Sequence, residues 1–284
     1  MRSLLFRIFF LALFGTAVIG GVFAYQAWTN GRETKIVFLD VGQGDAILIS
    51  QGSNQILIDG GRSGKTLLSA VARHIPFWDR TIEAVITTHP DADHIGGIPD
   101  LATMYRVPDY LSTGAASSSQ VFELLKKSLG NPGLTTTIDT RRQLSITFPR
   151  GGTLRVLYPD TVSDSGASNE GSIVSRFSFG ETDFLLTGDL PDEEKFLPNI
   201  GEAEVLKVSH HGSKYATSQA FLDLVRPKEA VISVGQNSYG HPDAGVIARL
   251  TDAGAIIRRT DRDGDIVYRC ISEATGCTFA GVAK

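Results

Sequence analysis

The segment 88–97, which reads THPDADHIGG, constrains this chain more than any other stretch. It places two imidazoles, His89 and His94, and two carboxylates, Asp91 and Asp93, within six positions. The mainly apolar run 84–87 before it predicts a buried strand, and two glycines close it. Four metal-binding side chains at the end of a strand indicate the floor of a metal-dependent hydrolytic site. A polar surface loop rich in Asp and His is the alternative.

Length and composition indicate a folded chain with an acidic body. The 284 residues suffice for one large domain or two small ones, and 42% of them are hydrophobic. Residues 1–32 hold three arginines and no acid, so the rest is more acidic than the net charge of −4 implies. An acidic body argues against broad non-specific binding of nucleic acid, although it leaves room for a local basic groove.

The N-terminal segment predicts a membrane or export signal. Residues 8–27 are almost all apolar or small, which matches the length that a helix needs to cross a bilayer. A signal anchor fits this length better than a cleaved signal peptide, because residues 22–24 (VFA) match a cleavage site poorly. Arg2 and Arg7 place the N-terminus in the cytoplasm. We therefore expect residues 1–30 to be a signal anchor or signal peptide. Residues 31–284 then form one extracytoplasmic domain, membrane-anchored or secreted.

The remaining pattern predicts two similar halves of strands and helices. Short apolar runs cut by turn residues predict an antiparallel meander at 36–41, 46–49 and 55–59. Helical periodicity follows at 65–75, and we expect a hairpin around Asp263 and Gly264. Further strands are predicted at 84–87, 143–148, 153–157, 172–179, 183–187, 203–208, 230–234 and 255–258, and helices at 97–105, 122–127, 193–197, 219–225 and 244–252. This order favours an α/β (α+β) chain with two packed sheets and helices outside, a four-layer αββα sandwich.

The two cysteines, Cys270 and Cys277, lie near the C-terminus, away from the His and Asp motifs. In an exported domain they are candidates for a disulfide. Two unpaired thiols are the alternative, because sequence spacing does not fix the geometry that a disulfide needs.

Histidines and aspartates gather at the ends of predicted strands. Of the six histidines, His74 lies in the predicted helix 65–75 without an acidic neighbour, and we interpret it as an ordinary helix residue. The others all follow apolar runs: His89, His94, His210, His211 and His241. Asp40, Asp59 and Asp189 also close apolar runs. One such Asp is usually a turn former, but this set predicts convergence on one pocket.

The spacing of the first motif suits two metal ions. His89 and Asp91 can bind one ion, and Asp93 and His94 can bind a second, with Asp189 as the candidate carboxylate between them. Two ions about 3.5–4 Å apart can activate water and hold both oxygens of a phosphoryl displacement.

Several motifs resemble a known family. The HPDADH of 89–94 resembles the HxHxDH signature of the metallo-β-lactamase fold, with Asp91 in place of the second His. Five further motifs resemble the C-terminal hydrolase domain of the ComEC/Rec2 family of competence proteins: LDVGQGDA at 39–46, LTGDL at 186–190, KVSHHGS at 207–213, SYGHP at 238–242 and TDRDG at 260–264. The resemblance covers about residues 35–270.

The resemblance implies the αββα metallo-β-lactamase fold for residues 31–284 and a site for two divalent ions. The implied ligands are His89, Asp91, Asp93, His94, Asp189, His210 and His241, and the implied catalytic residues are Asp93, His211 and Lys207. One of His210 and His211 is expected to bind metal or contact the scissile phosphate, and the other to support the loop. The usual mid-chain His ligand is absent, and Ser168, Asn169 and Glu170 stand near its place. An oxygen-rich site of this kind favours Mn²⁺ or Mg²⁺ over Zn²⁺ more than a β-lactamase site does. The expected cofactors are two divalent ions, Zn or Mn, and the choice between metals stays open.

Some charged residues have two interpretations. Asp59 is either a hydrogen-bond partner of a metal-binding His or a turn residue. The same choice holds for Asp40 and Asp45, with a preference for the structural role. Lys207 either pairs with phosphate or is a solvated strand-end lysine. The pairs Lys126–Lys127 and Arg141–Arg142 are expected to be solvated charges.

The sequence thus predicts a metal-dependent hydrolase, a phosphodiesterase or nuclease of ComEC type. Its expected partners are a phosphodiester substrate such as DNA and, through the N-terminal helix, a membrane. Hydrolysis of another ester (a small phosphodiester, a lactone or a lactam) is the alternative enzyme activity, because fold does not decide substrate. A non-catalytic metal-binding module is the alternative outside enzymes. The sequence predicts no oligomeric state.

Overall fold

The computed structural model describes residues 33–115, 117–130, 136–139, 144–159 and 169–283, with positions 14, 15, 18, 20 and 21. The segment predicted as a signal anchor or signal peptide therefore lies almost wholly outside the described residues, as do Arg141, Arg142 and Ser168. Within the described part of the chain, no helix combines the length and the apolar character needed to cross a bilayer.

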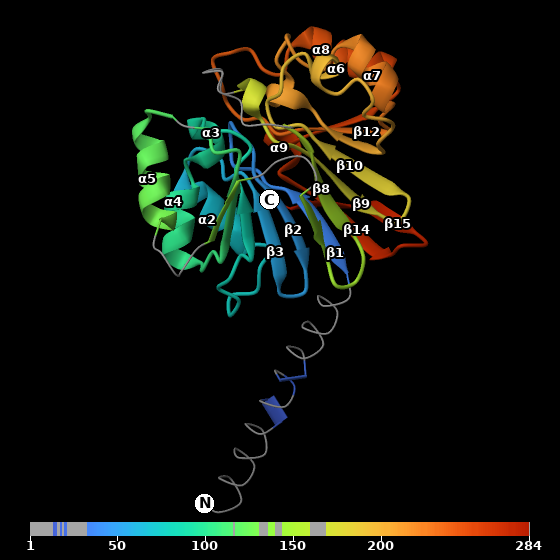
Figure 1. The fold of residues 1–284 in the computed structure, drawn as a ribbon. Helices are drawn as coiled ribbons and strands as arrows, with labels where there is room; N and C mark the ends of the chain where they lie inside the picture. Colours follow the sequence, from blue (N-terminus) through green and yellow to red (C-terminus); the bar gives the residue numbers. More distant parts are fainter. Residues whose placement is uncertain are drawn as a thin grey trace, which may run out of the picture.

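The first sheet has the strand order β15-β14-β1-β2-β3-β4-β5-β6 among the described residues (Figure 1). Its strands are β1 (Thr34–Phe38), β2 (Ile47–Gln51), β3 (Asn54–Ile58), β4 (Ala84–Ile86), β5 (Asp109–Ser112), β6 (Thr136–Asp139), β14 (Asp265–Ser272) and β15 (Gly276–Ala283). The predicted meander is confirmed, because β1, β2 and β3 pair antiparallel. From β3 to β6 the strands are parallel, since a helix or long loop returns the chain to the same end each time.

The second sheet has the order β13-β12-β11-β10-β9-β8-β7 and repeats this plan. Its strands are β7 (Ser145–Thr147), β8 (Thr153–Tyr158), β9 (Val174–Phe179), β10 (Thr182–Leu186), β11 (Val205–Lys207), β12 (Glu229–Ile232) and β13 (Ile256–Arg259). The strands β7 to β10 pair antiparallel, and β10 to β13 pair parallel. The carboxyl ends of each parallel set therefore lie along one edge of the sheet.

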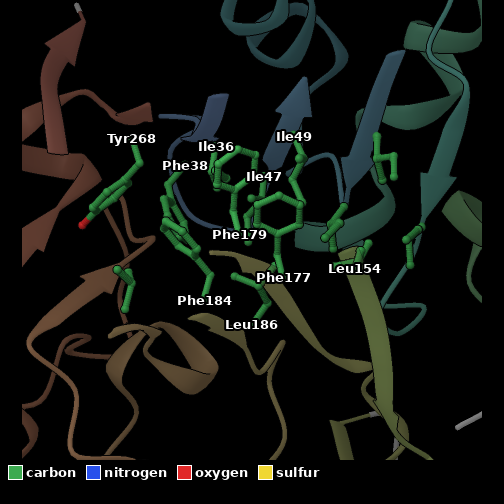
Figure 2. Close-up of a cluster of buried hydrophobic side chains, with 14 of the residues drawn as sticks. Ile36, Phe38, Ile47, Ile49, Leu154, Phe177, Phe179, Phe184, Leu186 and Tyr268 are labelled. Carbon is green, nitrogen blue, oxygen red and sulfur yellow. The ribbon is translucent and has the colours of Figure 1, made fainter. Parts of the chain in front are cut away.

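The two sheets pack face to face on an apolar core. Alternate residues of β1 show why: Ile36 and Phe38 point into this core, whereas Val37 packs on the opposite side. From the second sheet Phe177 and Phe184 enter the same layer (Figure 2). Because both faces of each central strand are buried, the strand sequences are continuous apolar runs.

Helices cover the outer face of each sheet, which confirms the four-layer αββα arrangement (Figure 1). The helices α2 (Gly64–Ala72), α4 (Ile98–Met104) and α5 (Gln120–Leu129) share a core with the first sheet, and α7 (Gln219–Val225) and α8 (Ala244–Asp252) share one with the second. Shorter helices are α3 (Ala92–Ile95), α6 (Glu193–Phe196) and α9 (Thr260–Asp263), with 3₁₀ turns η1 (Asn169–Gly171) and η2 (Ser209–Gly212).

Two local expectations change in the structure. The hairpin expected at Asp263 and Gly264 is wrong, because α9 carries the chain from β13 in one sheet to β14 in the other. The hairpin joins β14 and β15 instead, and there Cys270 and Cys277 lie opposite each other and form the disulfide. The helix predicted over 65–75 ends at Ala72, so His74 lies in the turn that follows.

The interpretation of His74 as an ordinary helix residue is also wrong, since it belongs to a buried charge cluster. The Asp265 carboxylate accepts hydrogen bonds from Arg73 Nε and Nη2, both at 2.8 Å, and lies 2.7 Å from His74 Nε2. It also accepts the backbone N–H of Asp40 at 2.8 Å. These donors outweigh the cost of burial and lower the pKa of Asp265. The carboxylate thereby joins β14, the turn after α2 and the start of the 40–45 loop.

We expect Asp265→Ala to lower the free energy of unfolding by about 3 kcal/mol, because it leaves the Arg73 guanidinium without its buried partner. The measurement is urea unfolding followed by circular dichroism. Asp261→Ala is the matched control, since Asp261 pairs with Arg259 on the surface two residues away. That change should cost less than about 1 kcal/mol. Equal losses in the two variants would contradict this account.

Candidate metal centre

The predicted site residues meet where the carboxyl ends of the parallel strands from both sheets converge. Asp59 follows β3 and the 88–94 segment follows β4, both in the first sheet. Asp189 follows β10 and His210 and His211 follow β11, in the second sheet. Because parallel strands end along one edge, residues as far apart in sequence as Asp59 and His211 come together there. The structure therefore brings Asp59, the 88–94 segment, Asp189, His210 and His211 together, as their strand-end positions predicted. Asp40 does not join them, since its carboxylate accepts the Gly42 N–H and its own N–H donates to Asp265.

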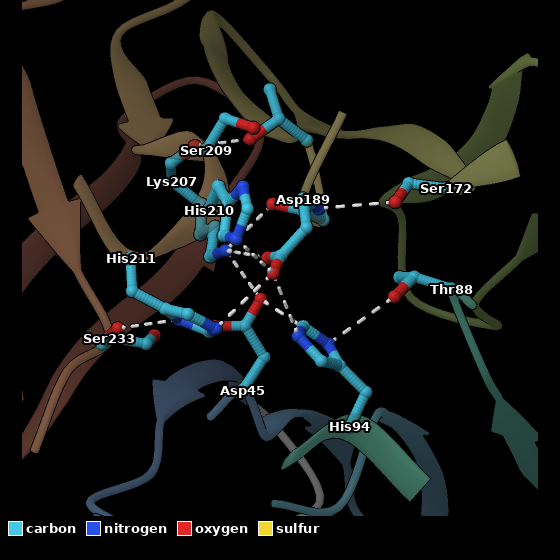
Figure 3. Close-up of polar contacts among 12 residues, drawn as sticks. Asp45, Thr88, His94, Ser172, Asp189, Lys207, Ser209, His210, His211 and Ser233 are labelled. Atoms are coloured by element: carbon cyan, nitrogen blue, oxygen red, sulfur yellow. Dashed lines mark hydrogen bonds and ion pairs between the residues drawn. The ribbon is translucent and has the colours of Figure 1, made fainter. Parts of the chain in front are cut away.

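Asp189 lies at the middle of this cluster (Figure 3). Its Oδ2 lies 3.2 Å from His94 Nε2, 3.3 Å from His211 Nε2 and 3.8 Å from His210 Nε2. His211 Nε2 also lies 3.6 Å from Asp93 Oδ2. Two elements, α3 with His94 and η2 with His210 and His211, thus direct imidazoles at a single carboxylate.

The donor atoms form sets that suit a metal ion. Among the described residues, four candidate sets each have their ligand atoms within 4.8 Å of one another: His89, His94 and Asp189; Asp93, His94 and His211; Asp45, Asp189 and His211; and Asp45, Asp59 and His94. Asp91 lies at the mouth, with its Oδ2 3.7 Å from His89 Nε2 and its side chain 44% exposed. The predicted first motif is thus brought to the cluster in full.

Several of these atoms are buried without a hydrogen-bond partner, and this is the evidence that the site fits divalent ions. They are Asp45 Oδ1, His89 Nε2, His94 Nε2, Asp189 Oδ1 and His211 Nε2. An unsatisfied buried polar atom typically costs about 1–3 kcal/mol. Cations bound among them would satisfy all of these lone pairs together. The residues present therefore fit the metal ions that the motifs predict.

Neighbouring groups hold two of the imidazoles in the orientation that metal binding needs. His94 Nδ1 lies 2.7 Å from Asp59 Oδ2, and His211 Nδ1 lies 2.9 Å from the carbonyl oxygen of Ser233. Each Nδ1–H donates to an oxygen, which leaves Nε2 as the ring nitrogen that faces the cluster. Asp59 itself accepts hydrogen bonds from the backbone N–H of Thr88 at 2.8 Å and from its hydroxyl at 2.7 Å. Of the two interpretations of Asp59, the geometry is that of a partner to a site histidine.

Lys207 is fully buried, so it is not a solvated strand-end lysine. Its Nζ forms an ion pair with Asp45 and donates to the carbonyl oxygen of Gly188 at 2.9 Å. It also lies 3.7 Å from Asp189 Oδ1. Burial lowers the pKa of Lys207, but Asp45 and Asp189 outweigh this and raise it, so the ammonium stays charged. Its position behind the carboxylates suits their neutralisation better than contact with a substrate phosphate.

At the inner residues of the cluster, the neighbouring charges together shift the pKa values more than burial does. Burial raises the pKa of Asp189, but His211 and His94 bring it well below its usual range. Burial likewise lowers the pKa values of His94 and His211, whereas their carboxylate neighbours raise both well above the usual value. For Asp93, too, the neighbouring imidazoles of His211 and His94 outweigh burial and lower the pKa.

His210 and His241 lie further out and behave differently. Their rings are 5.6 Å apart, and burial is the largest influence that lowers the pKa of each. Both imidazoles are therefore neutral at neutral pH. Near them, Asn169 Nδ2 lies 3.4 Å from His210 Nδ1, and Ser172 Oγ lies 3.4 Å from His89 Nδ1. Asn169 lies near the place where the family resemblance implies that the usual mid-chain His ligand is absent.

The preference for a structural role of Asp45, drawn from the sequence, was wrong. The structure makes Asp45 part of the cluster, fully buried beside Lys207 and 3.4 Å from His211 Nδ1. The signal was present in the LDVGQGDA motif, where Asp45 follows two glycines. Both adopt positive φ values, and a Cβ at Gly44 would lie 2.0 Å from the Asp93 carbonyl oxygen. Glycine is thus required for the 42–45 turn to approach α3.

The chain belongs to the metallo-beta-lactamase superfamily, whose family description matches residues 39–236. It is 29% identical over 84% of its length to ComE operon protein 3 of Bacillus subtilis, and 30% identical over 80% to Recombination protein 2 of Haemophilus influenzae. The matched region spans 33% and 28% of those proteins, so this chain corresponds to about a third of each.

A solved structure agrees on the fold. The metallo-beta-lactamase fold protein YhfI from Bacillus subtilis superposes with a TM-score of 0.60 at 16% identity, over 83% of this chain and 99% of that one. With the superfamily match, this shows the metallo-β-lactamase fold, and the His and Asp cluster has a composition that suits divalent metals. The expected resemblance to competence proteins is confirmed by the relatives.

We expect Asp59→Asn to weaken Mn²⁺ binding about 10- to 100-fold, because His94 loses the carboxylate that orients its ring. Competition with a chromogenic chelator measures this affinity. Asp79→Asn is the matched control: Asp79 accepts hydrogen bonds from Thr81 and Gln55 before β4, at the far end of the sheet. Unchanged Mn²⁺ affinity in Asp59→Asn would show that His94 does not depend on this contact.

Proposed function

We propose that this protein is a metal-dependent phosphodiesterase that cleaves nucleic acid outside the cytoplasm, held at the membrane by its N-terminal segment. The observation that carries the proposal is the set of buried, unpaired donor atoms around Asp189. Its carboxylate oxygens suit Mn²⁺ and its imidazole nitrogens suit Zn²⁺, and two such ions suit phosphoryl transfer. The names of two relatives, Recombination protein 2 and Competence protein ComA of Neisseria gonorrhoeae, refer to recombination and competence. They support a nucleic-acid substrate.

In this proposal the side chains divide between two ions. His89 and Asp91 would hold one, and Asp93, His94 and His211 the other, with Asp189 between them. Divalent ions there supply Lewis-acid stabilisation of phosphoryl oxygens and lower the pKa of water. Asp59 and the Ser233 carbonyl keep the imidazoles of His94 and His211 aimed at this point. The buried Lys207 ammonium neutralises part of the charge of Asp45 and Asp189.

The two adjacent histidines take different roles. His211 is buried and its Nε2 faces Asp93 and Asp189, which suits metal binding. The His210 side chain is 31% exposed, and its neutral imidazole faces the mouth of the site. We assign His210 to contact with the scissile phosphate and to proton transfer at its Nε2, and His241 to the outer rim as a further candidate ligand.

The decisive test is digestion of single-stranded and double-stranded DNA by the purified full chain with added Mn²⁺ or Zn²⁺. We expect cleavage, and a loss of more than about a hundredfold in His89→Ala, because His89 is a ligand rather than a ligand's partner. Asp79→Asn is the control, since Asp79 lies before β4 at the far end of the sheet, and it should retain activity.

Two results would redirect this proposal. Turnover of a small phosphodiester without cleavage of any DNA would contradict the nuclease assignment and favour another ester substrate. No turnover of either, by protein that holds metal, would favour a non-catalytic metal-binding module.

A further inference from the structure

We infer that Tyr239 forms a stacking subsite for one nucleobase of a single-stranded nucleic acid whose phosphate lies at the metal centre. This inference rests on the proposed function and names the structural class of its substrate. The subsite consists of the exposed Tyr239 ring and the His241 ring behind it.

A line of aromatic rings leads from the centre to this subsite. His210 Nε2 lies 3.8 Å from Asp189 Oδ2, and the His210 and His241 ring centroids are 5.6 Å apart. The Tyr239 ring follows at 5.7 Å from that of His241, with only 33° between the two planes. A phosphate held at the centre therefore brings its flanking bases within reach of Tyr239.

The loop that carries Tyr239 is pinned by one side chain. Asn237 Oδ1 accepts the backbone N–H groups of Tyr239 at 3.1 Å and His241 at 3.0 Å. Its Nδ2 donates to the carbonyl oxygens of Gly235 and His241, both at 2.9 Å. An aromatic ring on such a fixed loop loses little conformational entropy when a flat ligand stacks on it.

Tyr239 is 67% exposed in spite of these constraints, so a face of the ring is available to a ligand. The neighbouring loop supplies a cation and a second exposed aromatic, Lys214 and Tyr215. The two loops are joined where the Asp243 N–H donates to the Gly212 carbonyl oxygen at 2.8 Å. Exposed aromatics beside a basic side chain are the usual platform for single-stranded nucleic acid.

The geometry also selects against duplex substrates. In a duplex each base is covered on both faces by its neighbours, so only an unpaired or terminal base can stack on a protein ring. Among the described residues, Lys214 is the cation placed beside these exposed rings, next to a carboxylate-containing centre. Single strands and frayed ends are therefore the preferred substrates.

The test compares Tyr239→Ala, Tyr239→Phe and the unchanged full chain in detergent. Binding of a fluorescein-labelled oligothymidylate is followed by anisotropy with Ca²⁺ in place of Mn²⁺ to slow cleavage, and KM and kcat are then measured with Mn²⁺. We expect Tyr239→Ala to weaken binding and raise KM about tenfold, the order of one lost base stack. Tyr239→Phe keeps the ring and should bind within about twofold of the unchanged chain. Phe77→Ala is the control, since Phe77 is 70% exposed but precedes β4 at the far end of the sheet.

Oligonucleotides with a single abasic position locate the stacked base. In the unchanged chain one abasic position beside the scissile phosphate should weaken binding, and in Tyr239→Ala that penalty should vanish. Unchanged binding in Tyr239→Ala, or an equal loss in Tyr239→Phe, would overturn the subsite. Failure of the unchanged chain to cleave any DNA, with the binding differences intact, would instead overturn the proposed function. Failure to bind the oligonucleotide at all would overturn both.

Discussion

The structure depends on the burial of several ionised groups around one carboxylate. Asp189, Asp45 and Asp59 are all buried, and His94, His211 and Lys207 are buried against them. Taking such charges out of water costs several kcal/mol each unless partners compensate. Part of the compensation is visible, in the Lys207–Asp45 ion pair and the His94–Asp59 contact. The remaining unpaired atoms of the cluster are buried, and cations bound among them would satisfy these atoms and offset the carboxylate charge.

The two-sheet fold brings these charged groups together at one place. Each sheet ends its parallel strands at the same edge, and the apolar layer between the sheets holds those edges together. The Asp265 cluster adds a second tie, because it links β14 to the turn after α2 and to the loop leading to Asp45. The position of Asp45 thus depends on residues at both ends of the domain.

The sequence was sufficient for features that are local. Strand runs, the αββα order and the histidines at strand ends follow from short patterns, and these predictions were confirmed. It was insufficient where the partner lies far away in the chain. His74 meets Asp265 across 191 positions, and Lys207 meets Asp45 across most of the domain. No local pattern encodes such pairs, because they arise only when the sheets pack. The misplaced hairpin at Asp263 has the same cause, since β13 and β14 belong to different sheets.

The most direct test of the account is the metal content of the purified full chain after dialysis against Mn²⁺ and then against metal-free buffer. The arrangement around Asp189 predicts two tightly held ions per chain by mass spectrometry of the metal. Asp189→Asn should lose them, whereas Asp79→Asn should keep both. Fewer than one ion per chain in the unchanged protein would contradict the central claim that this buried cluster is a metal centre.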